Sequence, residues 1–460
     1  MEFENTSDKN ILLRVKSASN PAGRIGWKVR EAGLDFLKNK RVISFLKADV
    51  KLRPAKMEPN ASQSPHRIAL VSGGLGLGGA TTFLINFAGE LVRRGIPVAV
   101  MSFERENPLA ADFQKQNIPV LCLDQRRMIF EDRVNMILQN LVRFRPTVTV
   151  STLGAVSFEV LRYLPKGVFR IGMGQSDDPI VYDMMRHYAP WMDLTAMVSQ
   201  TMKQKAAAMP EFAETPVAYL PYGVPMCPDT ELPARDFTAP LRLLYLGRLG
   251  REQKRVHLFP EILSQLCANG MPFHWTIAGE GEERGFLEAN LKTISPNQTV
   301  SFAGPVRYAD VPALLKQHDI FLLASDYEGL PLSLLEAMGH GLVPVVSDLK
   351  SGIPEVVHAS NGILVSVNDV AGYARAIIHL HEHRNELAAR SAAARARVQT
   401  EFSVAAMTDR WLAAFAVLTS PLGAWPGRWK ITAPVTAGNP VFFSSLMRIL
   451  RRLVKKFSSR

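Results

Sequence analysis

Short apolar segments alternate with amphipathic helical segments through most of the chain, and this alternation restricts the possible fold more than any other feature. It begins near residue 66. The strands expected in the first half are Arg67–Gly73, Val98–Phe103, Val120–Leu123, Thr147–Ser151, Phe169–Gly174 and Leu194–Ser199. Strands separated by helices pair in parallel through right-handed crossovers, so the pattern predicts an α/β domain whose parallel sheet is covered on both faces.

A proline-rich stretch at residues 220–240 interrupts the alternation and is typical of a linker. The pattern then resumes, and the strands expected in the second half are Leu241–Gly247, Phe273–Ala278, Thr299–Ala303, Ile320–Ala324, Val343–Ser347 and Gly362–Ser366. The chain is thus expected to form two doubly wound, Rossmann-like halves in series. Ligands of such sheets bind at the carboxyl ends of the strands, which predicts a site in the cleft between the halves.

The cysteines and the charge distribution exclude several classes of protein. The three cysteines lack the spacing of zinc ligands or of a disulfide framework, which indicates a reducing compartment and no bound metal. No apolar run approaches the roughly 18–20 residues that span a bilayer, and the N-terminus lacks a signal-peptide pattern, so we expect a cytoplasmic protein. The net charge of +12 arises from residues 1–66 and 421–460, which argues against a nucleic-acid-binding core.

The segment at residues 325–338 carries two carboxylates eight positions apart, Glu328 and Glu336. An apolar strand precedes a turn that contains Gly329, and Pro331 lies where a helix would begin, a position that proline favours. The unpaired N–H groups and the positive dipole end of such a helix suit a diphosphate. The two carboxylates would then recognise neutral hydroxyls on either side of it.

A second segment places two cations after a strand, with Arg248 at its carboxyl end and Lys254 on the following loop. Such a pair can neutralise a diphosphate leaving group in place of a metal ion. The alternative is a pair of solvated surface charges.

A glycine-rich loop at residues 72–80 joins the first expected strand to the first helix. Its glycines fit the G-x-G-x-x-G pattern of dinucleotide sites, and Glu104 follows the second strand about where an acid that binds ribose would lie. Glycines there let backbone N–H groups approach a phosphate or a sugar. The alternatives are a tight turn for helix–sheet packing and a nicotinamide dehydrogenase, although a dehydrogenase leaves the Glu328–Glu336 pair unexplained.

Taken together, these motifs resemble the retaining glycosyltransferases of family 4, which have the GT-B fold, over roughly residues 67–420. The resemblance rests on motifs in a matching order: the glycine-rich loop, Pro-Tyr-Gly-Val at 221–224, Gly-Arg-Leu followed by Lys254, Ala-Gly-Glu-Gly at 278–281, Val-Ser-Phe-Ala-Gly at 300–304, and the E-x7-E pair Glu328 and Glu336.

The resemblance implies a role for each motif. Arg248 and Lys254 would bind the diphosphate of a UDP-, GDP- or ADP-sugar, and Glu336 would bind the ribose hydroxyls. Glu328 would lie near the reacting carbon, either as a nucleophile or as a group that stabilises an oxocarbenium-like state. The other implied donor-binding positions are Gly78, Gly79, Gly281, Val306, Gly329, Leu330, Pro331 and Leu332. The resemblance implies a metal-independent hexosyl transfer without a cofactor, since the nucleotide-sugar is a substrate.

The sequence departs from the family on the acceptor side. Relatives often carry a histidine after the strand expected at Phe169–Gly174, whereas this chain has Gln175-Ser-Asp177-Asp178-Pro. Either Gln175, Asp177 or Asp178 takes the place of the histidine, or no side chain there is essential. A helix-capping role is sufficient to explain the two aspartates without a metal ion.

With the resemblance, the chain divides into six expected parts. These are a basic helical N-terminal extension (1–65), an N-terminal acceptor domain (66–222), a linker (223–240), a C-terminal nucleotide-sugar domain (241–400), a helix that packs back toward the N-terminal domain (401–420), and a basic tail with an amphipathic helix (421–460).

The tail suggests a membrane partner. Its residues 442–457 interleave apolar side chains with arginine and lysine, and each basic residue near an anionic surface contributes about 1 kcal/mol. We hypothesise that this helix binds the inner face of the plasma membrane and that the acceptor is a glycan or a lipid-linked sugar of cell-surface polysaccharide or lipopolysaccharide. A helix that packs on the protein or stays solvated is the alternative.

Two other functions share the expected fold. A sugar-nucleotide epimerase would bind the same donor but need no acceptor. A scaffold without activity would retain the fold with a degenerate site, and the intact set of two cations and two carboxylates argues against it.

Overall fold

The structure is a computed structural model that describes residues 2–5, 11–14, 64–103, 107–122, 130–231, 239–294, 299–416, 423–425 and 431. The chain divides into two compact units. One comprises residues 1–53, 125–133 and 430–460, and the other comprises residues 54–124 and 134–429 and contains both large sheets.

The first large sheet has seven strands in the order β5-β4-β3-β6-β7-β8-β9, and every neighbouring pair is parallel. The strands are β3 (Ile68–Ser72), β4 (Val98–Ser102), β5 (Val120–Cys122), β6 (Val148–Ser151), β7 (Phe169–Gly174), β8 (Leu194–Met197) and β9 (Val217–Tyr219). The helices that connect them are α3 (Gly79–Arg93), α4 (Ala110–Lys115), α5 (Phe130–Phe144), α6 (Ala155–Leu161), α7 (Pro179–Tyr188) and α8 (Gln200–Ala207). Strands β3, β4 and β6 are buried at every residue because helices cover both faces of the sheet.

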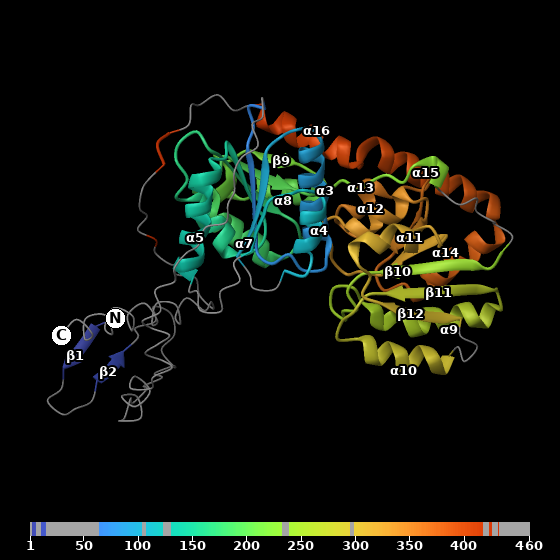
Figure 1. Ribbon diagram of the computed structural model, residues 1–460. Coiled ribbons are helices and arrows are strands. Elements are labelled where there is room, and N and C mark those ends of the chain that lie inside the picture. The colour runs from blue at the N-terminus through green and yellow to red at the C-terminus, as the bar shows by residue number, and fades with distance from the viewer. Residues whose placement is uncertain are drawn as a thin grey trace. The chain divides into compact units, whose positions relative to one another are not determined.

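The second large sheet has six parallel strands in the order β12-β11-β10-β13-β14-β15. Figure 1 shows β12, β11 and β10 side by side. The strands are β10 (Leu241–Leu246), β11 (Phe273–Ala278), β12 (Val300–Gly304), β13 (Ile320–Leu323), β14 (Val343–Ser347) and β15 (Ile363–Val365). The helices are α9 (Phe259–Asn269), α10 (Arg284–Ile294), α11 (Val311–Leu315), α12 (Leu332–Gly339), α13 (Ile353–Val356), α14 (Val370–Glu382), α15 (Arg384–Glu401) and α16 (Val404–Phe415).

The two parallel sheets confirm the fold class predicted from the alternation of strands and helices. All twelve expected strands are present, with ends that differ by at most two residues. Strand β9 was not predicted, because its apolar run of Val-Ala-Tyr is only three residues long and adjoins the proline-rich stretch.

The termini differ from the expected helical extensions where the structure describes them. Strands β1 (Glu2–Asn5) and β2 (Ile11–Arg14) pair in antiparallel fashion, so these residues form a hairpin instead of a helix. The sequence Glu-Phe-Glu-Asn alternates polar and apolar residues, a pattern that suits a strand better than a helix. The amphipathic helix expected at 442–457 lies outside the described residues.

Helix α16 lies alongside α3 and so returns the chain to the seven-stranded sheet (Figure 1). An aromatic cluster fills the contact, with the ring of Trp411 5.2 Å from that of Phe87 and the ring of Phe83 5.4 Å from that of Tyr222. Before α16, Val224 and Ser403 form a parallel bridge, in which the amide of Val224 donates to Phe402 and the amide of Val404 donates to Val224. The chain therefore crosses between the two sheets twice at the same place.

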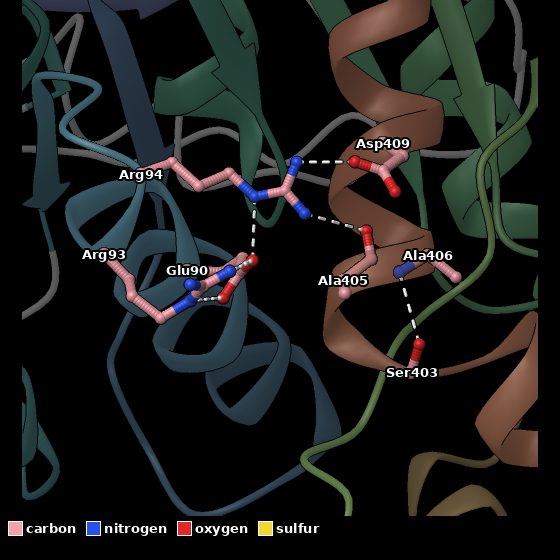
Figure 2. A network of polar contacts seen from close by, with 7 residues as sticks. All are labelled: Glu90, Arg93, Arg94, Ser403, Ala405, Ala406 and Asp409. Atoms are coloured by element: carbon pink, nitrogen blue, oxygen red, sulfur yellow. Dashed lines mark hydrogen bonds and ion pairs between the residues drawn. The ribbon is translucent and has the colours of Figure 1, made fainter.

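A polar network fixes α16 against α3 (Figure 2). Glu90, which is 9% exposed, accepts hydrogen bonds from Arg93 and Arg94 on its own helix. Arg94 also donates to the Asp409 carboxylate at 2.5 Å and to the Ala405 carbonyl at 3.2 Å, both on α16. Hydrogen bonds from Arg93 and Arg94 hold the pKa of Glu90 below its usual value, against the opposing effect of burial. The Arg94 guanidinium thus links the buried Glu90 carboxylate to α16.

We predict that Arg94→Ala lowers the free energy of unfolding by about 1–2 kcal/mol, because it removes charged hydrogen bonds to a largely buried carboxylate and to α16. Urea unfolding at neutral pH measures the loss. A carboxyl with a lowered pKa stabilises the fold above its usual pKa, so the difference from wild type shrinks as the pH falls through the acidic range.

Arg93→Ala is the matched control, because Arg93 is exposed and contacts only its own helix within this network. We expect a loss below about 1 kcal/mol, as for exposed ion pairs. Equal losses in the two variants would show that the contact with α16 contributes nothing.

Candidate active site

The turn between β13 and α12 carries the central part of the candidate site. Its backbone is fixed from two sides: the amide of Asp326 donates to the Gln253 carbonyl at 2.8 Å, and the amide of Gly352 donates to the Gly329 carbonyl at 2.7 Å. Pro331 is the N-cap of α12, one position earlier than predicted, with a φ of −66° that proline adopts without strain. The first N–H groups of α12 therefore lie at the end of the turn, without partners inside the helix.

Glu328 and Lys254 form an ion pair in this turn. The Lys254 Nζ lies 2.5 Å from the Glu328 Oε1, which also accepts a hydrogen bond of 2.7 Å from the Ser325 hydroxyl. The Glu328 side chain is 7% exposed and that of Lys254 is 15% exposed. The structure thus joins two residues that lie 74 positions apart in the chain, and the remaining Glu328 oxygen has no hydrogen bond to a described residue.

Arg248 lies beside this pair at the carboxyl end of β10. Its guanidinium is exposed and donates to the Gln253 side chain at 3.0 Å, and Gln253 in turn donates to the Tyr327 carbonyl at 3.3 Å. The Tyr245 hydroxyl donates to the Arg248 carbonyl and so fixes the backbone from below. Arg248 and Lys254 are therefore held on one loop, next to the turn that contains Glu328.

Glu336, one turn into α12, lies in a different environment. It is half-buried, and its carboxylate has no hydrogen bond or ion pair to any residue that the structure describes. Burial raises the pKa of Glu336 to about 8. At neutral pH, then, the group holds its proton and can both donate and accept a hydrogen bond.

The glycine-rich loop reaches the start of α12. Gly78 is the N-cap of α3 with a φ of 147°, which only glycine adopts readily, and Gly79 is the first helical residue. A Cβ atom at Gly79 would lie 3.3 Å from the Leu332 Cβ. Leu330 and Leu332 are buried beneath the turn, and the two loops together bring glycine backbone from the first sheet next to the helix start of the second.

Gly281 lies in a loop that packs on the loop containing Arg248. A Cβ atom at Gly281 would lie 2.3 Å from the Leu249 carbonyl oxygen, so only glycine fits there. Val306 follows β12 and is half-buried. The roles of Gly281 and Val306 in base binding remain predictions, as do the roles of the other donor residues.

Of the three residues expected on the acceptor side, Gln175 is the one that the structure places against the turn. A Cβ atom at Gly329 would lie 2.7 Å from the Gln175 carbonyl, and both amide atoms of the Gln175 side chain are buried without a hydrogen-bond partner. Asp177 pairs with Lys205 and accepts from the Tyr182 hydroxyl, whereas Asp178 caps α7 by accepting from the Ile180 amide.

The sequence prediction missed a contact between the two sheets. Tyr308, on the loop after β12, donates its hydroxyl to the Asn86 Oδ1 of α3 at 2.7 Å, and Asn86 donates to the Gly223 carbonyl at 3.1 Å. Burial, followed by the nearby Glu336, raises the pKa of Tyr308 to about 12. A second contact joins Glu355 to the backbone of α8, whose Gln200 and Thr201 amides donate to its carboxylate at 2.9 Å. No local pattern marks such pairs, since their partners are about 150 or more positions apart.

No group of three or more histidine, cysteine, aspartate or glutamate side chains in the described part of the chain is arranged to hold a metal ion. No described helix is long and apolar enough to span a membrane.

Comparison with known proteins connects this arrangement to glycosyltransferases. Residues 240–383, which contain the Glu328 turn, match the family described as glycosyl transferases group 1. AmsK of Erwinia amylovora, an amylovoran biosynthesis glycosyltransferase, is 37% identical over 175 residues, which are 36% of this chain and 42% of AmsK. WcaL of Escherichia coli K12, provisionally assigned as a colanic acid biosynthesis glycosyltransferase, is 34% identical over 189 residues, which are 39% of this chain and 46% of WcaL. The matched region therefore spans less than half the length of either relative.

Solved structures share the arrangement of the two sheets. TarM of S. aureus, in a complex that contains UDP, superposes with a TM-score of 0.65 at 12% identity, covering 76% of this chain and 99% of TarM. HepE of Anabaena, in complex with UDP and glucose, superposes with a TM-score of 0.62 at 18% identity, covering 77% of this chain and 100% of HepE. These neighbours show that the chain has the GT-B fold.

We predict that Glu336→Gln stabilises the unliganded protein at alkaline pH. Because the pKa of Glu336 is raised to about 8, the unfolded chain loses its proton first, so wild-type stability falls as the pH rises from the usual carboxyl pKa to about 8. The melting temperature of the variant should therefore exceed that of wild type more at pH 8.5 than at pH 5.5. Glu252→Gln removes an exposed carboxylate on the loop after β10 as a control, and an equal pH response in both variants would contradict the prediction.

We predict that Tyr308→Phe lowers the free energy of unfolding by about 1–2 kcal/mol, because it leaves the side-chain oxygen Oδ1 of Asn86 buried without its hydrogen-bond donor. Chemical unfolding of Tyr308→Phe, Asn86→Ala and the double variant measures the coupling. The loss in the double variant should be smaller than the sum of the single losses. Additive losses would show that the two side chains act independently.

Proposed function

We propose that this chain is a retaining glycosyltransferase that moves a hexosyl group from a nucleotide-diphosphate donor to a glycan or lipid-linked acceptor. The observation that carries the proposal is the Glu328–Lys254 pair with Arg248 beside it, at the start of α12. Two cations on one loop and a carboxylate in the turn before a helix start form a set of groups suited to a sugar joined to a diphosphate.

In the proposed reaction, the bond from the sugar C1 to the diphosphate oxygen breaks and a bond from C1 to an acceptor hydroxyl oxygen forms on the same face. The acceptor hydroxyl proton passes to the departing diphosphate. Arg248, Lys254 and the first N–H groups of α12 stabilise the charge that develops on the leaving group, which is electrostatic catalysis. These groups supply the positive charge, so the proposal needs no metal ion.

Glu328 is proposed to bind the transferred sugar and to stabilise positive charge at C1. Its close ion pair with Lys254 favours this electrostatic role over attack on C1, because a carboxylate that is neutralised by an ammonium group is a weaker nucleophile. Glu336 is protonated in the unliganded protein and has no hydrogen-bond partner among the described residues. We propose that it forms hydrogen bonds to the ribose hydroxyls when the donor binds.

We propose a UDP-sugar as the donor, because TarM and HepE are described in complexes with UDP. GDP- and ADP-sugars are the alternatives. The proposed pathway is the synthesis of a cell-surface polysaccharide or lipopolysaccharide, as for AmsK, which is described as acting in amylovoran biosynthesis. The protein is further proposed to act at the inner face of the membrane, to which the basic tail would bind.

The test measures thermal stabilisation and release of UDP with UDP-glucose, UDP-galactose and UDP-GlcNAc. A donor that binds the native state raises the melting temperature. We expect Arg248→Ala to abolish the shift, and Glu328→Gln to retain donor binding but to lower turnover by about 10²–10³-fold, as for a lost group that stabilises the transition state.

Arg251→Ala is the control, since Arg251 is an exposed cation on the same loop that contacts Glu283 instead of the turn. Its donor shift should match that of wild type. If no nucleotide-sugar of the UDP, GDP or ADP series produces a shift, the proposal fails, and if the donor sugar changes configuration without an acceptor, the protein is an epimerase.

A further inference from the structure

Few large apolar side chains are exposed among the described residues, and most of these few lie on one of the two large sheets. Four are more than a third exposed, and they are Ile180 at 74%, Leu77 at 59%, Phe286 at 39% and Leu153 at 38%. Phe286 lies on α10, at the second sheet, whereas the other three belong to the first sheet.

Leu77, Leu153 and Ile180, here called the apolar rim, follow three neighbouring strands. Leu77 lies after β3, Leu153 after β6 and Ile180 after β7, and these strands are adjacent in the sheet order. Neighbouring strands are about 4.8 Å apart, so the outer two of the three strands are separated by roughly 10 Å. Since all three strands are parallel, their carboxyl ends bring the apolar rim to one edge of the sheet.

Ordered loops present the apolar rim. The amide of Leu75 donates to the Asn107 side chain at 3.0 Å, which fixes the loop of Leu77. A Cβ atom at Gly154 would lie 2.8 Å from the Phe103 ring, so the loop of Leu153 packs closely on buried side chains. The three side chains are thus held in solvent by structured backbone.

The same loops contact the candidate active site. The loop of Leu77 continues to Gly79, which packs on Leu332. The loop that leads to Ile180, the second residue of α7, begins at Gln175, whose carbonyl lies against Gly329. The apolar rim therefore borders the first-sheet side of the turn that contains Glu328. A nucleotide-sugar has no alkyl or isoprenyl chain, so among the proposed substrates the acceptor is the one that can place a hydrocarbon chain at this edge.

We propose that the apolar rim binds the hydrocarbon portion of an amphiphilic acceptor, a sugar joined to an alkyl or isoprenyl chain, while the acceptor hydroxyl reaches the carbon beside Glu328. This inference rests on the proposed glycosyl transfer and names the class of its acceptor. Removal of an apolar chain from water at three adjacent side chains favours such a ligand over a free sugar.

The test compares two glucosides by calorimetry on the full chain in the presence of UDP: decyl glucoside, used below its micelle concentration, and methyl glucoside. We expect decyl glucoside to bind wild type at least tenfold more tightly than methyl glucoside does. Ile180→Ser combined with Leu153→Ser should remove at least tenfold of the decyl glucoside affinity. It should lower the melting temperature by about as much as Phe286→Ser does, because Leu153 and Phe286 are exposed to a similar extent and Ile180 is mostly exposed.

Phe286→Ser is the matched control, because it removes an exposed apolar side chain of the other sheet. It should retain the full affinity for decyl glucoside. The same affinity for the two glucosides in wild type, or an equal loss in Phe286→Ser and the rim variant, would overturn the inference. So would a rim variant that loses self-association in light scattering but keeps the affinity for decyl glucoside, since the apolar rim would then be an interface between copies of the chain.

The thermal shift with UDP-sugars, measured on the same variants, separates the two proposals. Donor shifts that persist in the rim variant, together with lost binding of decyl glucoside, support the inference. Donor shifts with no effect of the apolar rim on decyl glucoside overturn the inference alone. Absence of donor shifts in wild type overturns the proposed glycosyl transfer, whatever the glucosides show.

Discussion

The close approach of two backbones at Gly329 is the constraint on which the candidate site depends. The turn after β13 meets the Gln175 carbonyl of the first sheet with no room for a side chain, and its own carbonyl accepts from Gly352. The turn is therefore fixed by neighbours on both sheets. This position lets α12 begin beside the glycine-rich loop, and it brings Glu328 within reach of Lys254. A ligand bound at this turn would contact elements of both halves at once.

The two carboxylates of the E-x7-E pair have the same chemistry but different surroundings, and their surroundings suit them to different roles. Glu328 is buried with a cation and a hydroxyl, so its charge is already compensated before any ligand binds. Glu336 is half-buried without a hydrogen-bond partner among the described residues, and burial raises the pKa of its carboxyl to about 8. The first arrangement suits a group that faces developing positive charge, and the second suits a group that awaits neutral hydroxyl partners.

The sequence was sufficient to predict the features that depend on local pattern, which are the strands and the turn, but it did not predict contacts between distant segments. The apolar runs located twelve strands because buried parallel strands are continuous in their hydrophobicity, and Pro331 and Gly329 marked the turn through their backbone preferences. The pairing of Lys254 with Glu328, and of Tyr308 with Asn86, depends on how distant segments pack, and no local pattern encodes it. Likewise, Asp177 and Asp178 were candidates by position alone, until the structure showed their contacts with Lys205 and the α7 backbone.

The double crossing at Val224 and Ser403 has a mechanical consequence. A single connecting segment would let one half rotate about the other in any direction. Here two connecting segments are joined side by side by backbone hydrogen bonds, so they act as a hinge with one axis. Bending about the line through the pair costs little, but torsion would break the bridge. Separation of the two halves would then follow a single angular coordinate, and the distance between the Tyr308 hydroxyl and the Asn86 Oδ1 would measure it.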